Sequence, residues 1–138
     1  MAPSARSKAR KRAVDVLFEA SQRGLDPVSL LADRIVESGT QSSLPQYAAD
    51  IVEGVTAQLG RIDEAIETYA QGWALDRMPA VDLAVLRVGT WEILCNEEVD
   101  DPVAIDEAVE LARLLSTDES PAFVNGLLGR IARLKSTL

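Results

Sequence analysis

The stretch 79-PAVDLAVLRVGTWEILCNEE-98 is the most apolar part of the chain that keeps helical spacing. One apolar stripe follows the 3.6-residue repeat, and other apolar residues lie outside it: Val81, Ala84, Val85, Val88, Trp91 and Cys95 on the stripe, with Leu83, Leu86 and Ile93 on the remaining faces. A helix that is apolar most of the way round is buried on several sides. The stretch therefore predicts a central helix around which the others pack.

Helix signals recur on both sides of this stretch. Downstream, 100-DDPVAIDEAVELARLLS-116 and 120-SPAFVNGLLGRI-131 each begin with capping side chains and a proline. Upstream, we expect a helix from Ser4 to Gln22, a second from Asp26 to Gly39, a loop over 39–45, and a long helical pattern from Pro45 that bends or restarts near Gly60. Strand-like alternation of useful length is absent. The sequence predicts an all-α bundle of six or seven helices.

Composition argues against an enzyme. The chain has 138 residues and contains no histidine, the commonest general base and metal ligand. Cys95 lies on the buried stripe without a basic residue at helical spacing, so a structural thiol is expected. The acids around Asp100 and Glu107 are explained by helix capping and first-turn charges. With no phosphate loop and no zinc spacing, we expect no catalysis, no cofactor and no metal.

The cellular setting is inferred from what the sequence lacks. No apolar run reaches the roughly 18 residues that a membrane-spanning helix needs. The start, MAPSARSKARKR, has no apolar core of a secretory signal, and a single cysteine excludes an internal disulfide. We expect a cytoplasmic protein that does not enter a membrane.

Charge is strongly uneven along the chain. The formal net charge is −8, yet the first twelve residues carry five basic and no acidic side chains, so the rest carries −13. A basic arm can bind phosphates locally, because charges are screened beyond about 8 Å at physiological salt. The acidic remainder either suits a basic partner or serves solubility alone.

Phe18 lies on the flank of the first helix, about 100° from the core face formed by Ala13, Val16, Leu17 and Ala20. Two interpretations are open: the ring packs against a neighbouring helix, or it stacks on an unpaired RNA base while Lys8, Arg10 and Lys11 neutralise phosphates. Phe123 is likewise either a core residue or a binding residue. Gly126 and Gly129 are predicted to mark a close helix approach, because glycine inside a helix costs about 1 kcal/mol against alanine.

Residues 81–131, which include DEAVELA and FVNG, resemble the family of bacterial transcription antitermination factors called NusB. The basic opening 9-ARKRAVDVLFEA-20 matches the first helix of that family. The segments 72-GWALDRMPAVD-82 and 116-STDES-120 are similar to its actinobacterial branch. The resemblance covers nearly the whole chain.

The resemblance implies a single domain over 1–138, with two packed helical subdomains at about 4–72 and 76–136, and no enzymatic activity. Members bind the boxA element of ribosomal RNA leader transcripts, pair with NusE, a small-subunit ribosomal protein, and help RNA polymerase read through terminators. Carried over by position, the RNA surface comprises Arg6, Lys8, Arg10, Lys11, Phe18, Glu119, Ala122 and Phe123. Asp82 falls on the expected NusE surface. Some members have tyrosine at position 18 and a basic residue at 122, which puts one hydrogen bond and one phosphate contact in doubt.

Two alternative functions remain. The chain is either a protein-interaction module, for instance a homodimer whose RNA surface is masked, or a relative of the NusB-like domain of ribosomal RNA methyltransferases. The second alternative expects a methyl-donor domain downstream, and the sequence ends at Leu138 without one.

Overall fold

The computed structural model describes residues 4–38 and 45–137, and helices dominate both segments. In chain order the helices are α1 (Ala5–Arg23), α2 (Pro27–Ser38), α3 (Gln46–Ala57), α4 (Leu59–Tyr69), α5 (Ala80–Cys95), α6 (Asp101–Leu115) and α7 (Ser120–Leu134), with 3₁₀ turns η1 (Leu75–Arg77) and η2 (Lys135–Thr137). No strand occurs within these two segments. The all-α prediction is confirmed, with seven α-helices.

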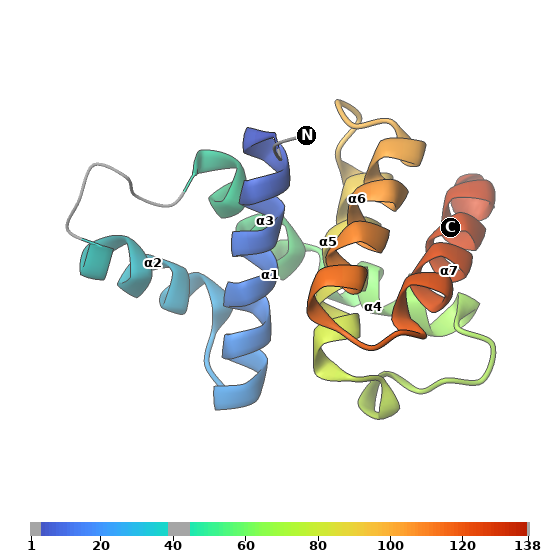
Figure 1. Ribbon diagram of the computed structural model, residues 1–138, viewed down its shortest axis with the longest axis horizontal. Helices are drawn as coiled ribbons and strands as arrows, with labels where there is room; N and C mark the ends of the chain where they lie inside the picture. Colours follow the sequence, from blue (N-terminus) through green and yellow to red (C-terminus); the bar gives the residue numbers. More distant parts are fainter. Residues whose placement is uncertain (1–3, 39–44, 138) are drawn as a thin grey trace.

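Helix α5 is the centre of the arrangement. It contacts α1 and α3 on one side and α4, α6 and α7 on the other. Figure 1 shows α1 to α3 gathered to one side of α5, and α6 and α7 to the other. The loop predicted over 39–45 falls almost entirely outside the described residues.

Local capping explains where the first helices begin and end. The Ser4 Oγ accepts a hydrogen bond from the Ser7 N–H at 3.0 Å, and Gly24 ends α1 in the left-handed conformation at φ 65°. The Asp26 carboxylate accepts from the Ser29 N–H at 3.0 Å and so caps the start of α2. The restart predicted near Gly60 lies at Gln58, between α3 and α4. The caps predicted at Asp100 and Ser120 differ: Asp100 makes no side-chain cap bond, and Ser120 is already the first residue of α7.

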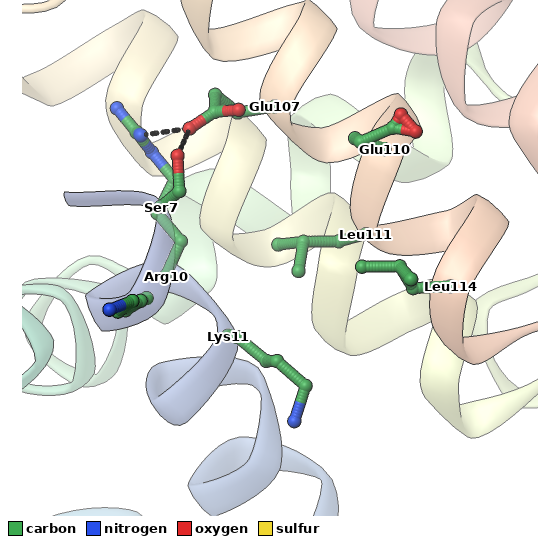
Figure 2. Close-up of a pocket in the computed structure, with 8 residues that line it drawn as sticks. Ser7, Arg10, Lys11, Glu107, Glu110, Leu111 and Leu114 are labelled. Carbon is green, nitrogen blue, oxygen red and sulfur yellow. Dashed lines mark hydrogen bonds and ion pairs between the residues drawn. The ribbon is translucent and has the colours of Figure 1, made fainter. Parts of the chain in front are cut away.

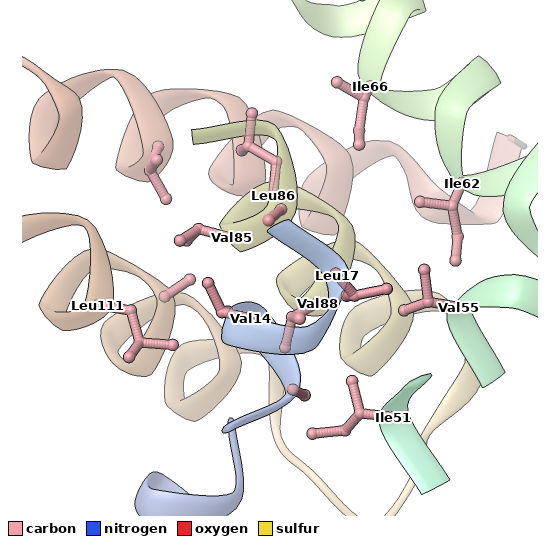
Figure 3. Packing of buried hydrophobic residues seen from close by; sticks show 14 of the residues in the cluster. Val14, Leu17, Ile51, Val55, Ile62, Ile66, Val85, Leu86, Val88 and Leu111 are labelled. Carbon is pink, nitrogen blue, oxygen red and sulfur yellow. The ribbon is translucent and has the colours of Figure 1, made fainter. Parts of the chain in front are cut away.

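One apolar core joins all seven helices. Figure 3 shows α1, α3, α4, α5 and α6 meeting in it through the side chains of Val14, Leu17, Ile51, Val55, Ile62, Ile66, Val85, Leu86, Val88 and Leu111. Among the residues that the structure describes, no helix is long and apolar enough to cross a bilayer.

The glycine prediction was wrong in position. A Cβ added at Gly126 or Gly129 would meet only the end of an arginine side chain, at 3.6 and 3.7 Å. The close approaches are at Gly89, where a Cβ would lie 2.7 Å from Leu128, and at Gly54, where it would overlap the Trp91 indole. The need for glycine thus arises where α5 meets its neighbours, which helix propensity does not reveal.

Candidate functional site

Lys8, Lys11 and Arg12 form an exposed strip within about 100° of arc on the first half of α1, and Arg6 is exposed on the side that faces Tyr47. Arg6 lies over the Tyr47 ring at 4.5 Å and 3.5 Å from Glu98, and Lys11 lies 3.6 Å from Asp15. Within the described chain, no ion-pair partner meets Lys8 or Arg12. Exposed ion pairs contribute less than about 1 kcal/mol, so the whole strip remains available to an anionic ligand.

Arg10 does not belong to this strip, which corrects the prediction that it contacts RNA. Its side chain is only 4% exposed. Its Nε donates to both oxygens of Glu92 at 3.0 and 2.9 Å, and its Nη1 donates to Glu107 at 2.7 Å. A guanidinium already held by two carboxylates inside the protein cannot neutralise a phosphate on the surface.

The Arg10 cluster extends across four helices, from α1 to α3, α5 and α6. The Tyr47 hydroxyl donates to Glu92, the Ser7 hydroxyl donates to Glu107, and the Asn96 amide donates to the Tyr47 oxygen at 3.0 Å. Burial raises the pKa of Glu92, against the opposing effects of Tyr47 and Arg10. Burial, together with the hydrogen bond to Glu92, also raises the pKa of Tyr47. The cluster fixes α1 against the other helices and so sets the direction in which its exposed lysines point.

A groove of about 250 Å³ runs between α1 and α6. Lys8 and Lys11 line one wall, and Leu111 and Leu114 supply an apolar wall from α6. Figure 2 shows the Lys11 and Leu114 side chains extending toward the space between the two helices. Leu114 is 69% exposed, which is unusual for a leucine beside a groove. Glu107 and Glu110 line the groove as well, so basic, apolar and acidic side chains meet in it.

Phe18 is partly buried and packs against the core. It is not sealed inside the bundle, and it lies on the flank where the helical wheel predicts it. The packing interpretation therefore holds for one part of the side chain. The stacking interpretation stays a prediction for the exposed part.

The three site residues predicted near the start of α7 line two adjoining pockets. Ala122 is exposed in a shallow pocket with Arg113, Thr117 and Asn125. Glu119 and Phe123 line a separate pocket of about 260 Å³ together with Trp73, Pro79, Asp82 and Thr117. Thr117 is common to both pockets, so they adjoin.

Sequence reasoning did not single out Trp73. The only signal was an aromatic residue in the polar connector 72–79. In the structure the Trp73 side chain is 52% exposed, and its ring centroid lies 6.0 Å from that of Phe123 with the planes tilted by 53°. A large aromatic residue left half exposed beside a pocket is a candidate binding residue.

Asp82, the residue predicted to contact a protein partner, is buried at 3% exposure. Its carboxylate accepts hydrogen bonds from the Ser116 and Ser120 hydroxyls at 2.5 and 2.9 Å. This corrects the prediction of a direct surface contact. Asp82 instead lies at the inner wall of the Trp73 pocket.

The surroundings of Cys95 favour a protonated thiol. Cys95 is partly buried, and Arg61 from α4 lies 3.9 Å from its Sγ, a basic neighbour that spacing within one helix does not reveal. Burial nevertheless raises the pKa of the Cys95 thiol, with Arg61 opposing, and a protonated thiol is a poor nucleophile. Among the residues described, no group of acidic or cysteine side chains is placed to hold a metal ion.

Residues 7–133 match the model of the NusB family. The chain is 58% identical over 135 residues to the transcription antitermination protein NusB of Kineococcus radiotolerans, covering 98% of each chain. It is 55% identical over 143 residues to the protein of the same name from Beutenbergia cavernae, covering 98% of this chain and 94% of the other.

Solved structures give the same result. The fold superposes on Thermotoga maritima NusB with a TM-score of 0.83 at 32% identity, over 96% of this chain and 93% of that one. It also superposes, with a TM-score of 0.81 at 26% identity, on a chain from a crystal structure of antitermination factors NusB and NusE in complex with double-stranded RNA. That match covers 93% of this chain and 96% of the other.

Proposed function

The chain belongs to the NusB family of transcription antitermination factors, and we propose that it binds a boxA-type RNA of ribosomal RNA leaders through the exposed strip of α1 while NusE binds beside it. In this role it acts within an RNA polymerase complex in the cytoplasm and promotes read-through of terminators. It works by binding and does not catalyse a reaction.

The observation that carries the proposal is the division of charge along α1. Arg10 turns inward to two carboxylates, while Lys8, Lys11 and Arg12 face outward from the same helix. Phosphates attract such a strip even on an acidic protein, because screening limits repulsion from the distant acids. The positive charge is therefore concentrated on one face of α1, and the Arg10 cluster fixes the orientation of that helix.

Phe18 and Ala122 extend the proposed RNA surface. The exposed part of the Phe18 ring offers a face to an unpaired base, and base–aromatic stacking contributes about 1–3 kcal/mol. Ala122 shares its pocket with Arg113, whose side chain is 59% exposed and forms an ion pair with the neighbouring Glu110. Some family members have a basic residue at position 122. Here Arg113 supplies the positive charge of that pocket, because Ala122 has none.

A fluorescence-anisotropy titration with a short unpaired boxA RNA tests the RNA surface. Lys11→Ala should weaken binding and reduce the slope of log affinity against log salt by about 0.7, the value for one phosphate on a single strand. The matched control is Lys135→Ala, which removes an exposed lysine paired with Asp101 beyond the end of α7. It should leave the slope unchanged.

Phe18→Leu tests stacking separately, because leucine keeps apolar bulk against the core but lacks a flat ring. Binding of the unpaired RNA should fall about fivefold or more, whereas binding of the same sequence as a duplex should change little. Circular dichroism checks the fold, and light scattering checks for a dimer that would mask the surface. If Lys11→Ala and Phe18→Leu both bind as wild type does, α1 is not the RNA surface.

A further inference from the structure

We propose that the Glu110 carboxylate holds Arg113 in the free protein in place of an RNA phosphate, and that a bound RNA strand displaces Glu110 where the strand crosses α6. Glu110 then lowers the affinity for RNA, and Arg113 contributes to binding only after Glu110 has released it. The inference rests on the proposed function in assuming that RNA binds along α1. It adds a route for the strand and a carboxylate that opposes its binding.

Helix α6 separates two parts of the proposed RNA surface, and Figure 1 shows it between α1 and α7. On the α1 side, the groove of about 250 Å³ has Lys8, Lys11 and Glu110 among its lining residues. On the α7 side, the Ala122 pocket of about 480 Å³ contains Arg113. A single strand that contacts both the α1 lysines and the Ala122 pocket therefore has to cross α6.

Three exposed side chains form the ridge of α6 at this crossing. On a helical wheel of about 100° per residue, Leu114, Glu110 and Arg113 follow one another from the α1 side of the helix to the α7 side. Figure 2 shows Glu110 and Leu114 on α6, across the groove from Lys11. The strand would thus meet an apolar side chain first, then a carboxylate, and then a guanidinium.

The ion pair on this ridge is one that a phosphate can replace. The Arg113 Nη1 donates to both carboxylate oxygens of Glu110 at 2.9 Å. Both side chains are more than half exposed, and water and salt leave such pairs with little net stability. A phosphate offers the guanidinium acceptors that are at least as good, in the same forked geometry. Exchange of the carboxylate for a phosphate is therefore favourable.

The charges of the Ala122 pocket explain why the exchange has to take place. Among the residues that the structure describes, one base and one acid line this pocket, Arg113 and Asp118. While Glu110 holds Arg113, the charge of the guanidinium is balanced, and Asp118 leaves the pocket negative. A phosphate is then repelled. Once Glu110 has released Arg113, the guanidinium can balance a phosphate instead.

Glu107, the other carboxylate of the groove, is not placed for this role. It accepts hydrogen bonds from the Arg10 Nη1 at 2.7 Å and from the Ser7 hydroxyl. Its side chain is only 26% exposed, and Arg10 is buried. Glu107 therefore belongs to the Arg10 cluster, whereas Glu110 holds an exposed cation and can change partners.

A fluorescence-anisotropy titration of the full chain with unpaired boxA RNA tests the proposal. Glu110→Gln keeps the length and helix propensity of the side chain but removes its charge, and it should strengthen RNA binding about threefold. The matched control is Asp106→Asn, an exposed acid one turn earlier on α6 that is not among the lining residues of the groove or the Ala122 pocket. It should leave the affinity within about 1.5-fold of wild type at physiological salt.

Arg113→Ala separates an exchange of partners from simple repulsion. It should weaken RNA binding about threefold and reduce the slope of log affinity against log salt by about 0.7, the value for one phosphate on a single strand. Adding Glu110→Gln to Arg113→Ala should then change the affinity by less than about 1.5-fold, because the carboxylate no longer has a guanidinium to hold. Circular dichroism of each variant checks the fold.

Four results would overturn the inference while Lys11→Ala still weakens RNA binding, which leaves the proposed function intact. Glu110→Gln binds RNA as wild type does; Arg113→Ala leaves affinity and salt slope unchanged; Asp106→Asn strengthens binding as much as Glu110→Gln; or Glu110→Gln keeps its full gain in the absence of Arg113, which would identify direct repulsion of phosphates in the groove. Wild-type protein that fails to bind the RNA at all would overturn both proposals.

Discussion

The buried charges at the two ends of the proposed binding surface are handled in opposite ways. At α1, Arg10 is enclosed and forms ion pairs with two carboxylates, Glu92 and Glu107. At the start of α5, Asp82 is enclosed but held only by the Ser116 and Ser120 hydroxyls. The first arrangement holds its charges by ion pairs between helices. The second holds a carboxylate in the first turn of α5 by serine hydroxyls.

This difference indicates which buried charge stabilises the fold and which takes part in binding. A charge paired internally contributes little to attraction at the surface, whereas one that is only hydrogen-bonded still projects its field. Arg10 thus orients the exposed lysines of α1 without binding a ligand itself. Asp82 links the first turn of α5 to Ser116 and Ser120, on either side of the turn before α7.

The largest expected effect comes from breaking the α1 arrangement. Arg10→Ala should lower the free energy of unfolding by about 3–5 kcal/mol, because it leaves two carboxylates without their buried partner. Urea denaturation measures the change. Lys8→Ala, two positions before Arg10 and exposed, should shift stability by no more than about 0.5 kcal/mol. Equal stabilities for the two variants would show that Arg10 is not structural.

Gly54 tests the packing behind the Arg10 cluster, where Trp91 lies 6.3 Å from the Tyr47 ring centroid. Gly54→Ala should destabilise by about 1–3 kcal/mol, since its methyl group overlaps the Trp91 indole. Gly126→Ala should instead stabilise by up to about 1 kcal/mol, because its Cβ meets only the Arg130 side chain. Thermal unfolding of both variants measures the contrast, and an unaffected Gly54→Ala would contradict the close approach.

Tyr47→Phe removes one hydrogen-bond donor to Glu92. It should lower the free energy of unfolding by about 1.5 kcal/mol at neutral pH. Its pH dependence has a defined sign. The pKa of Tyr47 is raised in the folded state, so above about pH 10 the unfolded chain loses this proton first and wild-type stability falls. The stability difference between wild type and variant should therefore narrow above pH 10. A constant difference from pH 7 to 11 would mean that Tyr47 titrates alike in both states.

Asp82→Asn should have the smallest effect on the fold, about 1 kcal/mol or less, because serine hydroxyls can both donate to and accept from an amide. It should nevertheless weaken NusE binding severalfold by removing the unpaired charge. Denaturation and titration with NusE measure the two effects. A large loss of stability with unchanged NusE affinity would place Asp82 with Arg10, as a structural charge only.

Helix order was predictable because it depends on local signals. The proline starts, Asp26 and the apolar stripe of α5 act within a few residues, so they show in the sequence. The partners of Arg10 could not be predicted in the same way, since Glu92 and Glu107 are 82 and 97 positions away along the chain. On the helical wheel of α1, Arg10 lies beside the core face and Lys11 lies nearly opposite it, but the wheel does not show which residues pair with Arg10. Trp73 was missed for the same reason, because Phe123 reaches it only after α4 to α7 have packed.

The sequence by itself determined the helices, the central place of α5 and the concentration of positive charge near the N-terminus. Only the tertiary structure decided which cations remain outside, which glycines are required, and which aromatic and acidic residues form a pocket. The physical reason is the separation along the chain over which each interaction acts. Helix propensity and capping act between residues close in sequence, whereas burial and ion pairing depend on which distant groups exclude water together.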